Sequence, residues 1–105
     1  MDTNQPISEQ YRLVGEDWAD AHAAASLLED GKSAFLAKLM SKHIDLPVNK
    51  REMIVKASDE WIQYLDKLSE SKKSAAKLQI QKEYLKMKFY EWQTHEANKR
   101  QEMRM

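Results

Sequence analysis

The sequence predicts an all-α protein, a long antiparallel helical hairpin of coiled-coil type with a short helix in its connection. Three observations predict this fold. The 105 residues include only two Gly and two Pro, so little of the chain can form tight turns. The commonest residues, Lys, Ala, Leu and Glu, are strong helix formers. Two long stretches carry apolar residues at alternating spacings of three and four, which is the period of one helix face.

The first predicted helix covers about residues 8–43. Ser8 is a suitable N-cap, because its hydroxyl can accept a hydrogen bond from a free N–H of the first turn. The helix should end near His43, since Pro47 disfavours helical geometry at the residue before it. Gly31 costs up to about 1 kcal/mol relative to Ala inside a helix, and we expect a kink there. The apolar face consists of Tyr11, Val14, Trp18, Ala21, Ala25, Leu28, Phe35 and Leu39, interrupted at Lys32.

A short helix should follow over about residues 50–57, and a long helix over about residues 59–102. Asn49 stands three residues before Glu52, which is the spacing of a capping box. Ser58 is the next N-cap candidate, with acidic residues behind it that favour the positive end of the helix dipole. Packing of the two long apolar faces would give a single helical domain over residues 1–105. The long helix presents Trp61, Tyr64, Leu68, Ser71, Ala75, Leu78, Lys82, Leu85, Phe89 and Trp92 on its apolar face.

The long helix also carries a second apolar stripe on the face opposite the first. This exposed apolar stripe consists of Ala76, Ile80, Tyr84 and Met87. One hairpin cannot cover both faces of a helix in so small a chain, so we expect a homo-oligomer, with a dimer favoured, or a partner protein. The alternative is that the first helix bends at Gly31, or the short helix folds back, and covers the stripe.

Charge is divided unevenly along the chain, although the net charge is zero. Residues 1–70 carry 8 basic and 13 acidic side chains, and residues 71–105 carry 9 basic and 4 acidic ones. The acidic half could pair internally with the basic half, or the basic half could bind an anionic partner. The charge distribution alone leaves both explanations open.

Lysines alternate with aromatic residues near the end of the long helix, where residues 83–100 read EYLKMKFYEWQTHEANKR. Exposed rings in a basic groove are typical of proteins that bind single-stranded nucleic acid. A solvated helix face explains the same lysines, and Phe89 and Trp92 are expected on the apolar face. The candidate nucleic-acid-binding residues, expected along one side of the helix, are Lys72, Lys73, Lys77, Lys86, Lys88, Tyr90, Lys99 and Arg100.

The sequence offers little for catalysis or metal binding. There is no cysteine, and no HExxH, Gly-rich phosphate loop or nucleophile elbow occurs. Glu91 and His95 are one helical turn apart, but a metal site needs further converging ligands. We therefore expect a non-enzymatic protein without cofactor or metal. No apolar run approaches the length of a membrane span, and the first ten residues lack a basic or apolar leader, so a cytoplasmic location is expected.

Three segments carry a resemblance to a known group of proteins. They are EDWADAHAAASLLEDGKSAFLAKLM, VNKREMIVKASDEWIQYLDKL and KEYLKMKFYEWQTHEANKRQEMRM. Together they resemble small, uncharacterised helical proteins of tailed bacteriophages and prophages, over most of the chain. The resemblance implies a setting in the cytoplasm of a bacterial host, close to replication and recombination functions, but no activity that can be assigned to particular residues.

Two classes of function follow from these observations. The first is an accessory of phage DNA metabolism that binds single-stranded DNA, or a recombination protein acting on it, through the basic helix. The second is a helical adaptor or inhibitor that binds a host protein through the exposed apolar stripe, without nucleic acid. A small virion component is a weaker third alternative.

Overall fold

The structure is a computed structural model that describes residues 5–104, and all of its regular elements are helices. They are α1 (Ile7–Asp30), α2 (Lys32–Met40), the 3₁₀ helix η1 (Ser41–His43), α3 (Val48–Lys56) and α4 (Asp59–Arg104). No strand occurs between residues 5 and 104. The all-α prediction is therefore confirmed. The prediction that the first ten residues form no leader falls partly on residues 1–4, which lie outside the described residues.

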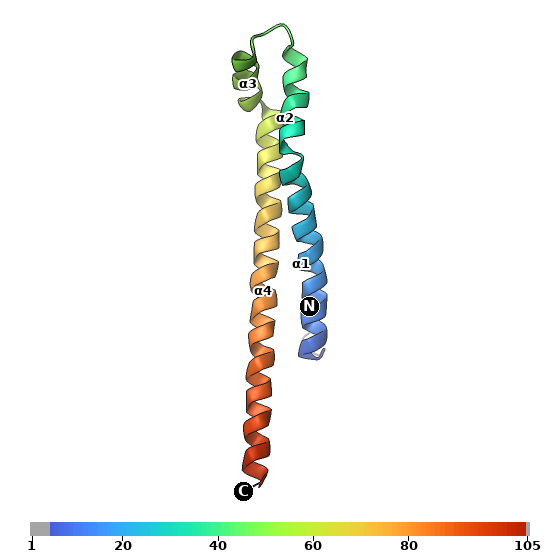
Figure 1. Ribbon diagram of the computed structural model, residues 1–105, viewed down its shortest axis with the longest axis vertical. Helices are drawn as coiled ribbons and strands as arrows, with labels where there is room; N and C mark the ends of the chain where they lie inside the picture. The colour runs from blue at the N-terminus through green and yellow to red at the C-terminus, as the bar shows by residue number, and fades with distance from the viewer. Residues whose placement is uncertain (1–4, 105) are drawn as a thin grey trace. The chain divides into compact units, whose positions relative to one another are not determined.

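The chain divides into two compact units. Unit 1 comprises residues 1–20 and 75–105, and unit 2 comprises residues 21–74. Unit 2 contains the end of α1, all of α2, η1 and α3, and the beginning of α4. Within it, α2 and the first turns of α4 run side by side in opposite directions, and α3 lies in the connection (Figure 1). The predicted hairpin with a short connecting helix is therefore confirmed.

The core of unit 2 forms around Trp61 near the start of α4. Trp61 is buried with Leu39 of α2 and Val55 of α3. Val55 is only 2% exposed, so the short helix is held to the hairpin by apolar burial. Partly buried apolar side chains complete the cluster, namely Phe35, Leu36, Met40 and Leu65.

Aromatic stacking orders the same core. The rings of Phe35 and Tyr64 lie 4.6 Å apart at an angle of 15°, and those of Trp61 and Tyr64 lie 6.1 Å apart at 2°. These separations fall in the range of attractive aromatic pairs. The connection is closed by Arg51, whose guanidinium donates hydrogen bonds to the carbonyls of Leu46 and Ile44.

Gly31 interrupts the first long helix, as predicted. It separates α1 from α2 with φ −82° and ψ −5°, a conformation that any residue can adopt. The reason for a glycine is space, because a Cβ here would lie 3.3 Å from the Tyr64 hydroxyl oxygen and 3.3 Å from the Leu27 carbonyl oxygen. That hydroxyl donates a hydrogen bond to the carbonyl of Leu28. The kink therefore brings α4 close to the backbone of α1 within unit 2.

Replacing Gly31 with Ala tests this close approach. We expect the Gly31→Ala variant to lose up to about 1 kcal/mol of stability, because the Tyr64 hydroxyl must shift by a few tenths of an ångström and weaken its hydrogen bond to Leu28. In a Tyr64→Phe background the same change should instead stabilise the protein by about 0.5–1 kcal/mol, since Ala is the better helix former. Urea unfolding of the four proteins measures both effects. The same change in stability in both backgrounds would contradict the steric explanation.

Unit 1 pairs the first part of α1 with the later part of α4. Its buried side chains are Val14 of α1 and Ala75 and Leu85 of α4. The Lys82 ammonium lies over the Trp18 ring, 4.1 Å from its centre, a cation–π contact between the two helices. Lysine is thus accommodated at an apolar-face position because its ammonium lies over the ring.

The predicted apolar faces agree with burial in both units. Every residue of the two predicted faces is buried or half-buried except Trp92, which is 51% exposed. The expectation that Trp92 lies on the packed face is therefore wrong. The reason is length, because α1 begins at Ile7, beside Phe89, and every described residue of α4 after Phe89 except Glu96 is exposed. Within unit 1, Trp92 therefore lies where α4 extends past its packing partner, an exposure that the unequal lengths of the two predicted helices allowed.

Two of the three predicted caps are wrong. The first helix begins at Ile7, so Ser8 lies inside its first turn. The short helix begins after Pro47 without a side-chain cap, and Glu52 pairs with Lys56 at 2.7 Å instead of forming a capping box with Asn49. Pro47 is itself the N-cap residue, and its carbonyl accepts hydrogen bonds from the N–H groups of Lys50 and Arg51. The Ser58 cap is confirmed by a 3.3 Å hydrogen bond from the Trp61 N–H to its hydroxyl.

Candidate nucleic-acid interface

The predicted nucleic-acid-binding residues all lie on α4 and all are exposed. They are Lys72, Lys73, Lys77, Lys86, Lys88, Tyr90, Lys99 and Arg100. Lys72 and Lys73 belong to unit 2, and the other six belong to unit 1. The candidate interface is therefore the part of α4 within unit 1.

The helical repeat divides these residues between two sides of α4. Lys77, Lys88 and Lys99 are spaced by eleven residues, which is three turns plus about 20°, so the three form one row along the helix. Lys86 stands about 160° from Lys88 and belongs to the other side, with Tyr90. The expectation of one basic side is replaced by a three-lysine row, with about 16 Å between neighbouring lysines.

Two lysines outside this row are engaged within the chain. The Lys72 ammonium pairs with the Glu29 carboxylate at 2.9 Å, and its hydrogen bond holds the pKa of Glu29 below the ordinary value. The Lys82 ammonium makes the cation–π contact with the Trp18 ring. Internal pairing of the acidic and basic halves, the alternative to an anionic partner, thus occurs at Lys72. Because its ammonium is paired with Glu29, Lys72 is not part of the candidate interface.

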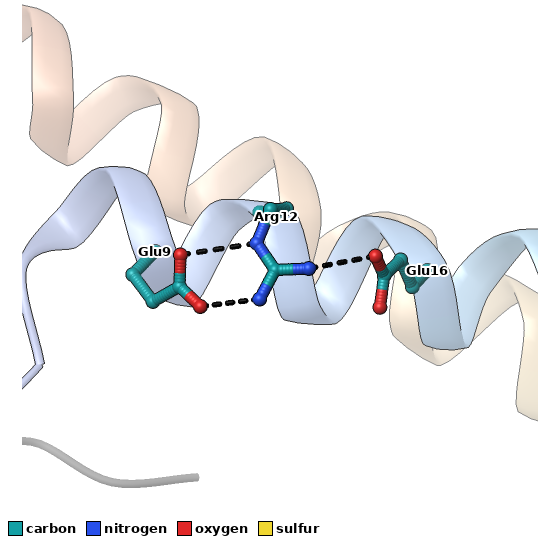
Figure 2. Close-up of polar contacts among 3 residues, drawn as sticks. All are labelled: Glu9, Arg12 and Glu16. Carbon is teal, nitrogen blue, oxygen red and sulfur yellow. Dashed lines mark hydrogen bonds and ion pairs between the residues drawn. The ribbon is translucent and has the colours of Figure 1, made fainter.

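The acidic residues near the start of α1 pair within their own helix. Arg12 lies between Glu9 and Glu16 and binds both carboxylates (Figure 2). Its side-chain hydrogen bonds to Glu9 hold the pKa of that carboxyl below its usual value. Glu9 and Glu16 are thus partly neutralised by Arg12 within their own helix.

Aromatic rings accompany the lysines of unit 1. Phe89 is half-buried, whereas Tyr90 is 55% and Trp92 is 51% exposed. The Phe89 and Trp92 rings lie 6.0 Å apart with an angle of 29° between their planes. Trp92 follows Lys88 by four residues, which places it on the adjacent turn beside the lysine row. The rings therefore offer a flat apolar surface next to fixed positive charge.

Two clefts flank Phe89 in unit 1, where α1 begins. The smaller, of about 250 Å³, is lined by Ile7, Ser8, Tyr11, Lys86, Phe89 and Tyr90. The larger, of about 440 Å³, is lined by Gln5, Pro6, Ile7, Ser8, Gln10, Lys88, Phe89 and Trp92. The clefts share Phe89, and each has one lysine at its edge. Sequence reasoning missed them, because neither Gln5 nor Ser8 belongs to a motif.

The exposed apolar stripe of α4 remains uncovered in this chain. Ile80 is 68%, Tyr84 58% and Met87 62% exposed, and Ala76 is exposed as well. Lys88 reaches back over the Tyr84 ring at 5.5 Å. Covering of the stripe by the first helix or the short helix, the alternative considered from the sequence, is not observed.

The described residues offer no metal centre or membrane span. Between residues 5 and 104, no three His, Cys, Asp or Glu side chains gather closely enough to hold a metal ion. Glu91 and His95 line a shallow surface depression with Tyr90, Thr94 and Asn98. No helix in the same range combines the length and apolar character needed to cross a membrane.

Comparison of the chain with protein-family models, curated proteins and solved structures gave no match in any of the three.

Proposed function

We propose that this protein binds single-stranded DNA, without catalysing a reaction, through the exposed part of α4 in unit 1. The observation that carries the proposal is the row of Lys77, Lys88 and Lys99, with the half-exposed Trp92 ring on the adjacent turn. A lysine row can follow a phosphate backbone, and aromatic rings stack on bases of any sequence. In the setting implied by the resemblance to phage proteins, this is an accessory of DNA replication or recombination.

The charge on the part of α4 in unit 1 supports this proposal. Unit 1 as a whole is close to neutral, with 8 basic and 9 acidic side chains, and Arg12 pairs with two of the acidic ones at the start of α1. Residues 75–104 of α4 contain seven basic and four acidic side chains. This excess favours an anionic partner, and its effect on binding should weaken with salt.

Fluorescence anisotropy of a labelled single strand tests the proposal. We expect binding at about 50 mM salt that weakens by about tenfold or more at about 200 mM, because three phosphate contacts on a single strand release about two counterions. The duplex of the same sequence is the control and should bind more weakly, since its bases are not free to stack on Trp92. Absence of binding at the lower salt would contradict the proposal.

A second function is favoured by the exposed apolar stripe, whose three large side chains are each more than half exposed. In this alternative the protein is an adaptor that binds a partner protein, or a second copy of itself, through that stripe. The basic residues would then keep the surface soluble rather than bind DNA. The two functions use adjoining surfaces of α4, because Lys88 of the lysine row lies over the Tyr84 ring of the stripe, 5.5 Å from its centre.

Replacing Ile80 and Tyr84 with Glu tests the role of the stripe. If the stripe is the interface of a homodimer, two carboxylates per chain in a buried apolar contact should dissociate it fully, since burial of an unpaired charge is very unfavourable. Sedimentation velocity would then show a dimer for the native chain and a monomer for the variant. The control carries Gln81→Glu and Gln93→Glu, the same charge at exposed polar positions. A dimer that survives in the stripe variant would exclude this interface.

A further inference from the structure

The exposed apolar stripe and the lysine row border each other on the part of α4 in unit 1. The Lys88 ammonium lies 5.5 Å from the centre of the Tyr84 ring. By the helical repeat, Lys88 stands about 100° from Met87, and Lys77 stands about 100° from Ala76 in the same direction. The row therefore runs along one edge of the stripe, about a quarter turn from its middle. A protein that covers the stripe must come close to Lys88.

The side chains of the stripe are complementary in size to a second copy of the stripe. Ala76, Ile80, Tyr84 and Met87 follow one another at spacings of four, four and three residues. When two stripes meet antiparallel, Ala76 of one lies opposite Met87 of the other, and Ile80 lies opposite Tyr84. A small side chain then faces a large one at both ends, which fills the space between the helices. Parallel pairing would leave a gap between two alanines and crowd two methionines.

We propose that two copies of this chain pair antiparallel through the exposed apolar stripe, and that a bound single strand tightens the pair. The twofold rotation that relates antiparallel helices keeps the same edge of each helix on the same face of the pair. The two lysine rows therefore form one basic face, on which Lys77 of one copy lies beside Lys88 of the other. This inference rests on the proposed function, because the strand is the anion that this face receives.

The area of the stripe explains why the pair depends on the strand. Its three large side chains, Ile80, Tyr84 and Met87, are each more than half exposed. At roughly 100 Å² for each side chain, two copies bury about 600 Å² of apolar surface. Stable interfaces between proteins usually bury at least about 1,200 Å² in total. The stripe alone therefore holds two copies together weakly.

The charges on the shared face explain the direction of the coupling. The axes of packed helices lie about 8–10 Å apart, so Lys77 and Lys88 of opposite copies repel each other within the screening length of about 10 Å. Phosphates that lie between the two rows replace this repulsion with attraction. A phosphate bound by Lys88 also draws the ammonium away from the Tyr84 ring, which leaves the ring free for burial. Strand binding and pairing of the two copies thus favour each other.

Sedimentation velocity with and without oligo(dT) measures the coupling. At about 50 mM salt we expect oligo(dT) to lower the dissociation constant of the pair by about tenfold, an ordinary size for coupling between two binding sites. A variant with Ile80→Gln and Tyr84→Gln keeps the charge and the lysine row. It should stay monomeric and bind oligo(dT) about tenfold more weakly, since the coupling is reciprocal. The control carries Leu27→Gln and Met103→Gln, at exposed apolar positions outside the stripe, and should behave as the native protein does.

Disulfide cross-linking tests the antiparallel arrangement, because the chain has no cysteine of its own. We would mix the Ala76→Cys and Met87→Cys variants and oxidise them with copper phenanthroline in air. The mixture should form a disulfide between the two variants, and oligo(dT) should raise its yield. Neither variant should link to itself, since identical positions lie about 16 Å apart along the antiparallel pair, beyond the reach of a disulfide.

The outcomes separate this inference from the proposed function. Cross-linking of either cysteine variant with itself, without the mixed disulfide, overturns the antiparallel pair. Salt-sensitive binding of oligo(dT) by a chain that stays monomeric, or with equal affinity in the native protein and the stripe variant, overturns the coupling and leaves the DNA-binding proposal standing. The stripe would then serve a different partner. Failure of the native protein to bind oligo(dT) overturns both, even if the mixed disulfide forms.

Discussion

Replacing Lys77, Lys88 and Lys99 together with Glu is expected to weaken binding to single-stranded DNA by two to three orders of magnitude at low salt. Each lysine–phosphate contact on a single strand releases about 0.7 counterion. One contact therefore raises the binding constant about eightfold at 50 mM salt relative to 1 M salt, and three contacts raise it about 500-fold. Anisotropy titration measures the loss. Circular dichroism should show unchanged helix content, because all three side chains are exposed.

A second triple variant is the control for this experiment. Lys38, Lys50 and Lys67 are exposed residues of unit 2, and their replacement with Glu changes the net charge by the same amount. We expect this control to weaken binding by less than about tenfold, through the general field of the protein alone. Equal losses in the two variants would mean that net charge, rather than the lysine row, determines binding.

Truncation of Trp61 should have the largest effect on stability. Trp61 is 5% exposed in the core of unit 2, and removal of a buried large aromatic side chain typically costs about 3–5 kcal/mol. Trp61→Ala should therefore lower the urea midpoint strongly, since its ring also orders Phe35 and Tyr64 by stacking. The matched control is Trp92→Ala, at a half-exposed position. Its expected loss is below about 1 kcal/mol. Similar losses for both would contradict the assignment of the core.

Periodicity predicted the packed faces well, because burial follows the helical repeat and needs no knowledge of the partner. The same reasoning placed the interruption at Gly31, where a residue of low helix propensity stands within a long apolar pattern. It could not predict why Gly31 is needed. That reason lies in the Tyr64 hydroxyl, which is 33 positions away in the chain and reaches the site only after the hairpin has formed.

Local capping rules failed at both helices that follow a proline. Pro6 and Pro47 precede α1 and α3, and their carbonyls accept the first helical hydrogen bonds, so each helix begins directly after its proline rather than at the expected Ser or Asn. At the candidate interface the lysines could be named from sequence, and the eleven-residue spacing of Lys77, Lys88 and Lys99 could have grouped them as well, because the helix over residues 59–102 was already predicted. Gln5 could not be identified as a cleft residue, because the clefts beside Phe89 form only where the start of α1 meets α4 within unit 1.

The salt dependence of single-strand binding tests the central claim most directly. We would measure the slope of log K against log salt concentration for the native protein and for the variant in which Lys77, Lys88 and Lys99 are replaced with Gln. Three lost phosphate contacts should reduce the slope by about 2, at about 0.7 per contact. The same replacements at Lys38, Lys50 and Lys67 should leave it unchanged. A slope that is the same in the native protein and the row variant would show that these three lysines do not contact the phosphate backbone.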